Sequence, residues 1–80
     1  MNIGALVGTN IVRIRNRQNV KQEELAFRAK IDRSYLSQIE AGKRNPSLKL
    51  LAKLAESLNV KVAVFLMEDE DVTEPGTSGK

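Results

Sequence analysis

Apolar positions recur along most of the chain with the period of amphipathic helices. Val7, Ile11 and Ile14 repeat at i, i+4 and i+7, which predicts a first helix over residues 5–18. The same kind of pattern predicts helices over residues 22–29, 33–41 and 47–59. The last of these has an expected buried face made of Leu51, Leu54, Ala55 and Leu58.

Residues with distinct backbone preferences mark the ends of these helices. Asn19 and Gly42 can adopt the left-handed conformation that terminates a helix. Asp32 and Ser47 are suited to cap the helices that follow them, because their side-chain oxygens can accept hydrogen bonds from unpaired amides. The pattern therefore divides the chain into helices joined by short turns.

Residues 60–67, VKVAVFLM, fit two kinds of structure. Val62, Phe65 and Leu66 match a short fifth helix at i, i+3 and i+4. An alternating set of apolar residues matches a strand instead, a structure that β-branched side chains favour; it consists of Val60, Val62, Val64 and Leu66. We favour the helix, and both structures stay open at this point.

The stretch from Gln22 to Ser47 has the spacing of two short helices joined by a tight turn. Counted from Gln22, apolar residues fall at positions four, eight, ten, fifteen and eighteen, and the small residue Ala26 at position five lets the two helices touch. This is the pattern of a helix-turn-helix. From Val7 to Leu66 the chain resembles the phage-repressor (Cro-like, XRE-type) family of DNA-binding domains.

The resemblance implies an all-α fold, a compact five-helix repressor-like domain that binds double-stranded DNA. One residue departs from the family pattern. Lys30 stands at position nine of the motif, where glycine is common because the backbone turns left-handed. A non-glycine residue there is expected to cost on the order of 1 kcal/mol without breaking the turn.

Charge divides the chain into a basic body and an acidic tail. Residues 1–67 hold 12 Lys and Arg against 5 Asp and Glu, whereas residues 68–80 hold 5 Asp and Glu and one Lys. The tail has almost no apolar side chains, so we expect a disordered tail over 68–80 and one small domain over 1–67. A basic body suits a polyanion such as DNA.

Several other classes of function are disfavoured by what the sequence lacks. The chain has no Cys and no His, and therefore no disulfide framework and none of the commonest zinc ligands. It carries no nucleophile–base pair and no glycine-rich phosphate loop, so we do not expect an enzyme. Its apolar runs are too short to span a bilayer. We expect a cytoplasmic protein with no metal, no cofactor and no membrane association.

The second helix of the motif carries polar residues on the side opposite its apolar ones. Arg can bond guanine O6 and N7, Gln can bond adenine N6 and N7, and Ser can serve either role. In phage repressors the first, second and sixth positions of this helix read bases, which by resemblance assigns base reading to Arg33, Ser34 and Gln38. The full set of outward candidates for base contacts is Arg33, Ser34, Ser37 and Gln38.

Residues that flank this helix are candidates for contacts with the DNA backbone, which position the protein without reading sequence. The resemblance implies that Gln22 bonds a phosphate and braces the first residue of the recognition helix. Lys21 directly precedes the helix that begins at Gln22. Its side chain cannot accept a hydrogen bond and so cannot cap that helix, but its cation can meet a phosphate. Tyr35 could reach a phosphate or pack over the edge of the core. The remaining candidates are Lys43, Arg44 and Asn45.

Arg15 and Glu40 are expected to have a structural role. Phage repressors pair an Arg of the first helix with a Glu at the end of the recognition helix, and these two positions match. The resemblance therefore implies a partly buried ion pair that fixes the angle of the recognition helix.

Together these features predict a sequence-specific transcription regulator, a repressor or autoregulator that binds an inverted repeat as a homodimer. The alternative is an antitoxin-type DNA-binding protein whose C-terminal segment binds a toxin or another protein partner. A strand at residues 60–67 would favour the antitoxin type, and a helix would favour a regulator or a restriction–modification controller. The expected dimer surface consists of Leu58, Val62, Val64 and Leu66.

Overall fold

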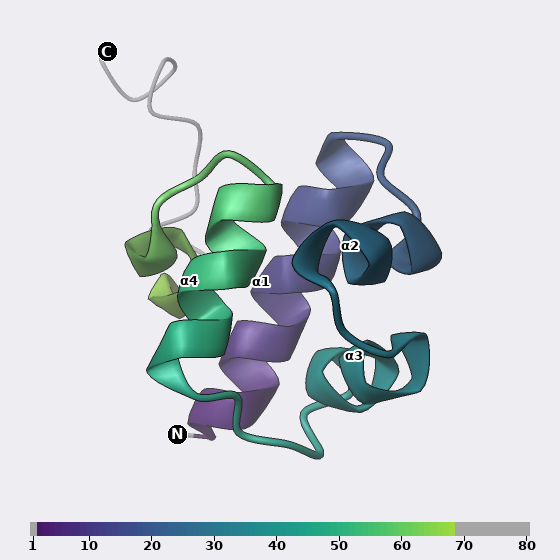
Figure 1. The fold of residues 1–80 in the computed structure, drawn as a ribbon. Helices are drawn as coiled ribbons and strands as arrows, with labels where there is room; N and C mark the ends of the chain where they lie inside the picture. The colour runs from purple at the N-terminus through teal and green to yellow at the C-terminus, as the bar shows by residue number, and fades with distance from the viewer. Residues whose placement is uncertain (1, 69–80) are drawn as a thin grey trace, which may run out of the picture.

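The computed structural model describes residues 2–68 and is helical throughout its regular elements. Within these residues it has four α-helices, α1 (Ile3–Arg17), α2 (Gln22–Ala29), α3 (Arg33–Glu40) and α4 (Leu48–Ser57), followed by a 3-10 helix, η1 (Val62–Leu66) (Figure 1). The all-α class is confirmed. Apart from Glu68, the predicted acidic tail lies outside the described residues. None of the described helices is long and apolar enough to cross a membrane.

The segment after α4 differs from the α-helix that the sequence favoured. Val62–Leu66 winds as a 3-10 helix, and no strand forms in residues 2–68. The five-helix count is therefore not confirmed in its original form. The β-branched side chains of Val62 and Val64 disfavour an α-helix, whereas a single 3-10 turn is enough to bury Phe65 completely.

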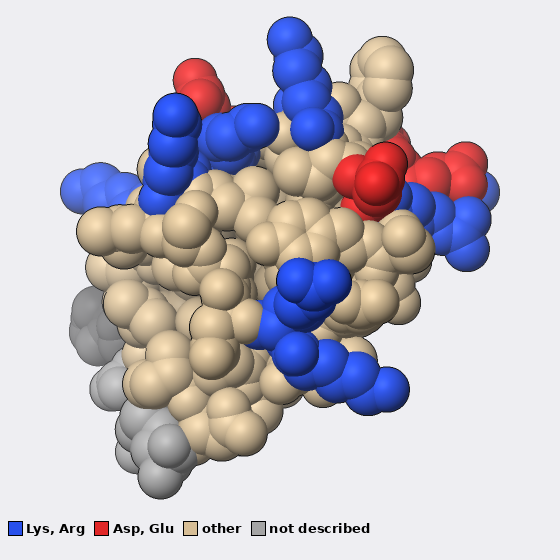
Figure 2. Space-filling model, turned by 60° about the horizontal axis from the view of Figure 1, so that its bottom comes forward, with Lys and Arg blue, Asp and Glu red and all other residues tan. Residues whose placement is uncertain are grey.

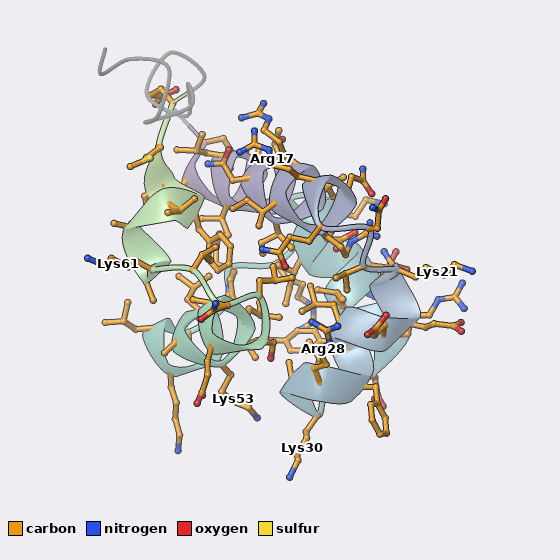
Figure 3. The ribbon with its side chains drawn as sticks, turned by 90° about the horizontal axis from the view of Figure 1, so that it is seen from above. Arg17, Lys21, Arg28, Lys30, Lys53 and Lys61 are labelled. Atoms are coloured by element: carbon orange, nitrogen blue, oxygen red, sulfur yellow. The ribbon has the colours of Figure 1, made fainter. Side chains whose placement is uncertain are left out.

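The hydrophobic core lies between α1 and α4, which Figure 3 shows on opposite sides of the domain. α1 packs against α3 and η1, while α4 packs against α2 and η1. Each fully buried Val, Leu, Ile or Phe side chain stabilises the fold by roughly 1.5–3 kcal/mol. The largest of them are Val7, Ile11, Leu25, Leu36, Ile39, Leu54, Leu58 and Phe65.

Side chains cap two of the four α-helices. Asn2 Oδ1 accepts from the Ala5 amide at 3.0 Å, so α1 begins two residues before its predicted start. Ser47 Oγ accepts from the Leu50 amide at 3.0 Å, as predicted. Asp32 holds the N-cap position of α3, but its side chain makes no capping hydrogen bond, because the exposed carboxylate faces solvent. That part of the prediction is wrong.

A buried asparagine ties the end of the fold to α1. Asn10 is 1% exposed, and its Nδ2 donates to the carbonyl oxygens of Phe65 and Met67, both at 2.8 Å. Arg13 donates to Asn10 Oδ1 at 3.1 Å, so both polar atoms of the carboxamide are satisfied. The two bonds from Asn10 Nδ2 hold η1 and the residue after it on α1.

The expected dimer surface needs one correction. Leu58 is 0% exposed and belongs to the core of the single domain, so its assignment to a dimer surface is wrong. Val62 and Val64 are half-buried and pack against the core, whereas Leu66 is 45% exposed. Of the four residues of the expected dimer surface, Val62, Val64 and Leu66 remain available to a second copy.

Candidate nucleic-acid interface

α2 and α3 form the two helices of the predicted motif, and the turn between them passes through Lys30. Lys30 has a φ of 61°, the left-handed conformation expected at position nine. The Ile31 amide donates to the Ala26 carbonyl at 3.0 Å and closes the turn. Ala26 and Ala29 are buried, and their small side chains let α2 approach its neighbours closely.

The structure brings the four predicted base-reading residues together on the exposed side of α3. Leu36 and Ile39 are 0% exposed and hold the opposite side of the helix against the core. A helix that presents several donors and acceptors on one solvent face can read base edges in a major groove. The exposed residues are Arg33, Ser34, Ser37 and Gln38.

Arg33 has a weak partner on α2. Its Nη1 lies 3.5 Å from Glu23 Oε1, and the two side chains are 65% and 70% exposed. A surface pair of this kind contributes less than about 1 kcal/mol. Arg33 can therefore exchange Glu23 for a base without a large penalty.

Glu40 joins three helices at the end of α3. Arg15 on α1 donates to it twice, from Nε to Oε2 at 2.8 Å and from Nη2 to Oε1 at 3.1 Å. Arg15 Nη1 also donates to the Val20 carbonyl at 3.0 Å. The Arg15 and Glu40 side chains are only 13% and 6% exposed, so this is a largely buried, two-pronged ion pair.

Gln22 reaches the same carboxylate from the start of α2. Its Nε2 donates to Glu40 Oε1 at 2.9 Å, so the residue that it braces is Glu40, at the end of α3, and not Arg33 at its beginning. Lys21, Gln22, Glu23 and Arg33 line an open recess of about 250 Å³ beside the α2 N-terminus. Lys21 provides no side-chain cap there, as expected for lysine.

The loop that follows α3 folds back along the helix. Gly42 has a φ of 78°, and the Lys43 amide donates to the Gln38 carbonyl at 2.9 Å. Arg44 Nε donates to Gln38 Oε1 at 2.8 Å, and its guanidinium carbon lies 5.2 Å from the centre of the Tyr35 ring.

Basic side chains spread over the face to which this loop belongs. Lys43, Arg44 and Asn45 are exposed, and Tyr35 is half-buried at the edge of the core. Figure 2 brings the underside of Figure 1 forward, with α3 and the loop. Lys and Arg side chains stand at several places across it, while acidic ones are fewer and gather mainly toward its upper right. A surface of this charge suits a phosphate backbone.

Gly8 sets the distance between α1 and α3 and was not singled out from the sequence. A Cβ atom at Gly8 would lie 2.5 Å from the carbonyl oxygens of both Ile39 and Glu40. The backbones of the two helices therefore touch at this residue. A glycine on the buried side of an amphipathic helix, one position after Val7, was the available signal.

Known proteins resemble this chain over nearly the whole of its helical domain. A helix-turn-helix family model matches residues 11–65. The uncharacterized HTH-type transcriptional regulator y4dJ of Sinorhizobium fredii is 39% identical over 77 residues, which covers 96% of this chain and 99% of that protein. The control protein C.BamHI of Bacillus amyloliquefaciens is 41% identical over 61 residues and 75% of each chain.

A solved structure has the same fold. The restriction-modification controller protein C.Esp1396I, crystallised as a tetramer in complex with its natural 35 base-pair operator, superimposes with a TM-score of 0.74 and 34% identity. The match covers 81% of this chain and 86% of that one. With the family match and the left-handed turn between α2 and α3, these likenesses show that the chain belongs to the XRE family of helix-turn-helix transcription regulators.

Proposed function

We propose that this protein is a sequence-specific DNA-binding repressor or autoregulator that binds an inverted-repeat operator as a homodimer. The observation that carries the proposal is the exposed polar side of α3, held in place from behind by two fully buried residues, Leu36 and Ile39. The controller C.Esp1396I, which shares the fold, was crystallised on its operator.

Base reading would fall to the outward residues of the recognition helix. Arg33 has the fork geometry for guanine O6 and N7, and Ser34 and Ser37 can donate to or accept from a base edge. Gln38 lies one turn further along the same exposed side. Their only side-chain partners within residues 2–68 are the weak Glu23 contact of Arg33 and the Arg44 contact of Gln38.

Backbone contacts would come from residues on either side of that helix. Gln22 keeps a second Nε2 hydrogen after its bond to Glu40, and that hydrogen can be donated to a phosphate. Lys21 and Lys43 add cations that release counterions on binding. The proposed backbone set is Lys21, Gln22, Tyr35, Lys43, Arg44 and Asn45.

A two-fold homodimer would place two such helices in successive major grooves, about one helical turn apart. Leu66, with Val62 and Val64 beside it, is the apolar surface that we assign to this contact. The helical form of residues 62–66 supports the regulator over the antitoxin type, because the strand that would favour the latter does not form within the described chain.

The proposal is tested by selecting bound duplexes from a random DNA library at near-physiological salt. We expect an enriched inverted repeat with half-sites about a turn apart. Arg33→Ala should weaken binding by about 1–3 kcal/mol and relax the preference at one base pair in each half-site. Binding without any enriched sequence would refute the proposal, and an unchanged preference in Arg33→Ala would refute the assigned reading face.

A further inference from the structure

Two side chains of α3 and one from the loop after it form a cluster that simple base reading does not require. Arg44 Nε donates to Gln38 Oε1 at 2.8 Å, and the Arg44 guanidinium carbon lies 5.2 Å from the centre of the Tyr35 ring. Tyr35 is half-buried and packs against the core, so its ring is a fixed support. The left-handed Gly42 and the bond from the Lys43 amide to the Gln38 carbonyl place Arg44 there.

The contact divides the hydrogen-bonding groups of Gln38 unequally. A glutamine carboxamide has one acceptor oxygen, which carries two lone pairs, and two N–H donors. Here the oxygen already accepts from a cation, a type of hydrogen bond about twice as strong as one between neutral groups. Within residues 2–68 the Nε2 group donates to no other residue, and Gln38 itself is exposed. Gln38 therefore offers a ligand two N–H donors, and its one remaining lone pair lies beside a guanidinium that favours acceptors over donors.

This division bears on which base Gln38 can read. Paired recognition of adenine needs both halves of the carboxamide, since Oε1 must accept from adenine N6 while Nε2 donates to N7. With Arg44 on one lone pair of Oε1, the N6 amino group of adenine would have to share that oxygen with a cationic donor, which opposes its own partial positive charge. Guanine presents two acceptors, O6 and N7, in the major groove, and both suit the free Nε2 donors.

We propose that Arg44 is a positioning and specificity-determining residue, which holds Gln38 as a hydrogen-bond donor and so directs it toward guanine and away from adenine. This inference rests on the proposed function. It assigns Arg44 a role beyond that of a backbone contact. The role needs the planar guanidinium, which can stack on Tyr35 and donate from Nε at the same time; a lysine ammonium retains the charge but not this geometry.

Arg44→Lys is the informative variant, and Lys43→Ala is its control. Arg44→Lys keeps a cation for the phosphate backbone and removes the Nε donor. Lys43→Ala removes a neighbouring cation that makes no side-chain contact with Gln38 in the described residues. The base pair read by Gln38 is first located as the one whose preference is lost in Gln38→Ala. Competition binding then uses duplexes that differ only there.

We expect the unaltered protein to prefer guanine at that base pair. Arg44→Lys should reduce the preference for guanine over adenine at least about fivefold, the ratio that one hydrogen bond of ordinary strength supports, with the salt dependence of binding unchanged. Lys43→Ala should keep the preference and bind all duplexes more weakly. In a Gln38→Ala background, Arg44→Lys should have no further effect on base choice.

A preference for adenine in the unaltered protein would overturn the inference, and so would an Arg44→Lys variant that keeps the preference for guanine. Failure of the proposed function looks different, because the random library would then yield no enriched sequence and both proposals would fall. An enriched operator with base choice indifferent to Arg44→Lys would overturn the role of Arg44 alone.

A second measurement needs no DNA. The side-chain amide signals of Gln38, assigned by their absence in Gln38→Ala, are recorded by nuclear magnetic resonance in the free protein. Loss of a charged donor at Oε1 should move these signals in Arg44→Lys and leave them in place in Lys43→Ala. Signals that move in neither variant would show that Arg44 does not hold Gln38, and would overturn the inference.

Discussion

Replacing Gly8 with alanine should force α1 and α3 apart. The added Cβ would lie 2.5 Å from the Ile39 and Glu40 carbonyl oxygens, whereas ordinary contact begins at 3.4 Å, so the two backbones must separate by about 0.9 Å. Overpacking against rigid groups costs about 1–3 kcal/mol or more, and alanine recovers about 1 kcal/mol of helix propensity. With a cost near the upper end of that range, the net loss is about 2 kcal/mol.

Gly4→Ala provides a matched control on the same helix. Its added Cβ would lie 2.7 Å from the side-chain oxygen of Asn45, which can rotate away, and farther from any backbone atom. Because alanine recovers the same helix propensity here, we expect Gly4→Ala to be neutral or to stabilise the domain by up to about 1 kcal/mol. The two variants make the same chemical change and differ in what the new methyl group meets.

Thermal unfolding followed by far-ultraviolet circular dichroism measures the difference, at one protein concentration so that association does not confound it. A loss of about 2 kcal/mol corresponds to a fall in Tm of roughly 8–16 °C for a domain of this size. A Gly8→Ala variant at least as stable as Gly4→Ala would refute the close approach of α1 and α3.

The remaining predictions concern three other contacts. Lys43→Ala should weaken DNA binding evenly across sequences and lower the slope of log affinity against log salt by about one; altered base preference would contradict its assignment to the backbone. Arg15→Met should destabilise the domain by roughly 3 kcal/mol in urea unfolding, because the Glu40 carboxylate is left buried, and adding Glu40→Leu should restore part of the loss. Asn10→Leu should cost roughly 2–4 kcal/mol, because the Phe65 and Met67 carbonyls lose their donors; wild-type stability would show that those hydrogen bonds contribute nothing.

The helices and the reading face could be predicted because each depends on neighbours in sequence. The 3.6-residue period identified the buried Leu36 and Ile39, and the same period left Arg33 and Gln38 facing outward. Lys30 adopts the left-handed turn despite its side chain, since the buried contacts on either side outweigh a local preference of about 1 kcal/mol.

Long-range contacts were beyond reach of the same reasoning. The partners of Asn10 are backbone carbonyls 55 and 57 residues away, and nothing in a local pattern identifies them. Leu58 satisfied both the α4 core pattern and the dimer expectation, and only packing decides that it is fully buried. The bond between Arg44 and Gln38 depends on how Gly42 turns the loop, which residue type alone does not specify.

The proposed base-reading residues of α3 and its fully buried residues, Leu36 and Ile39, are separate sets, and this separation makes the protein a scaffold for new specificities. Exchanging Arg33, Ser34 or Ser37 alters no buried contact, because all three are exposed. The helix position is set independently by Gly8 behind it and by Glu40 at its end. Operator preference can therefore diverge or be redesigned by a few substitutions without renewed selection for folding, whereas the supporting residues must remain.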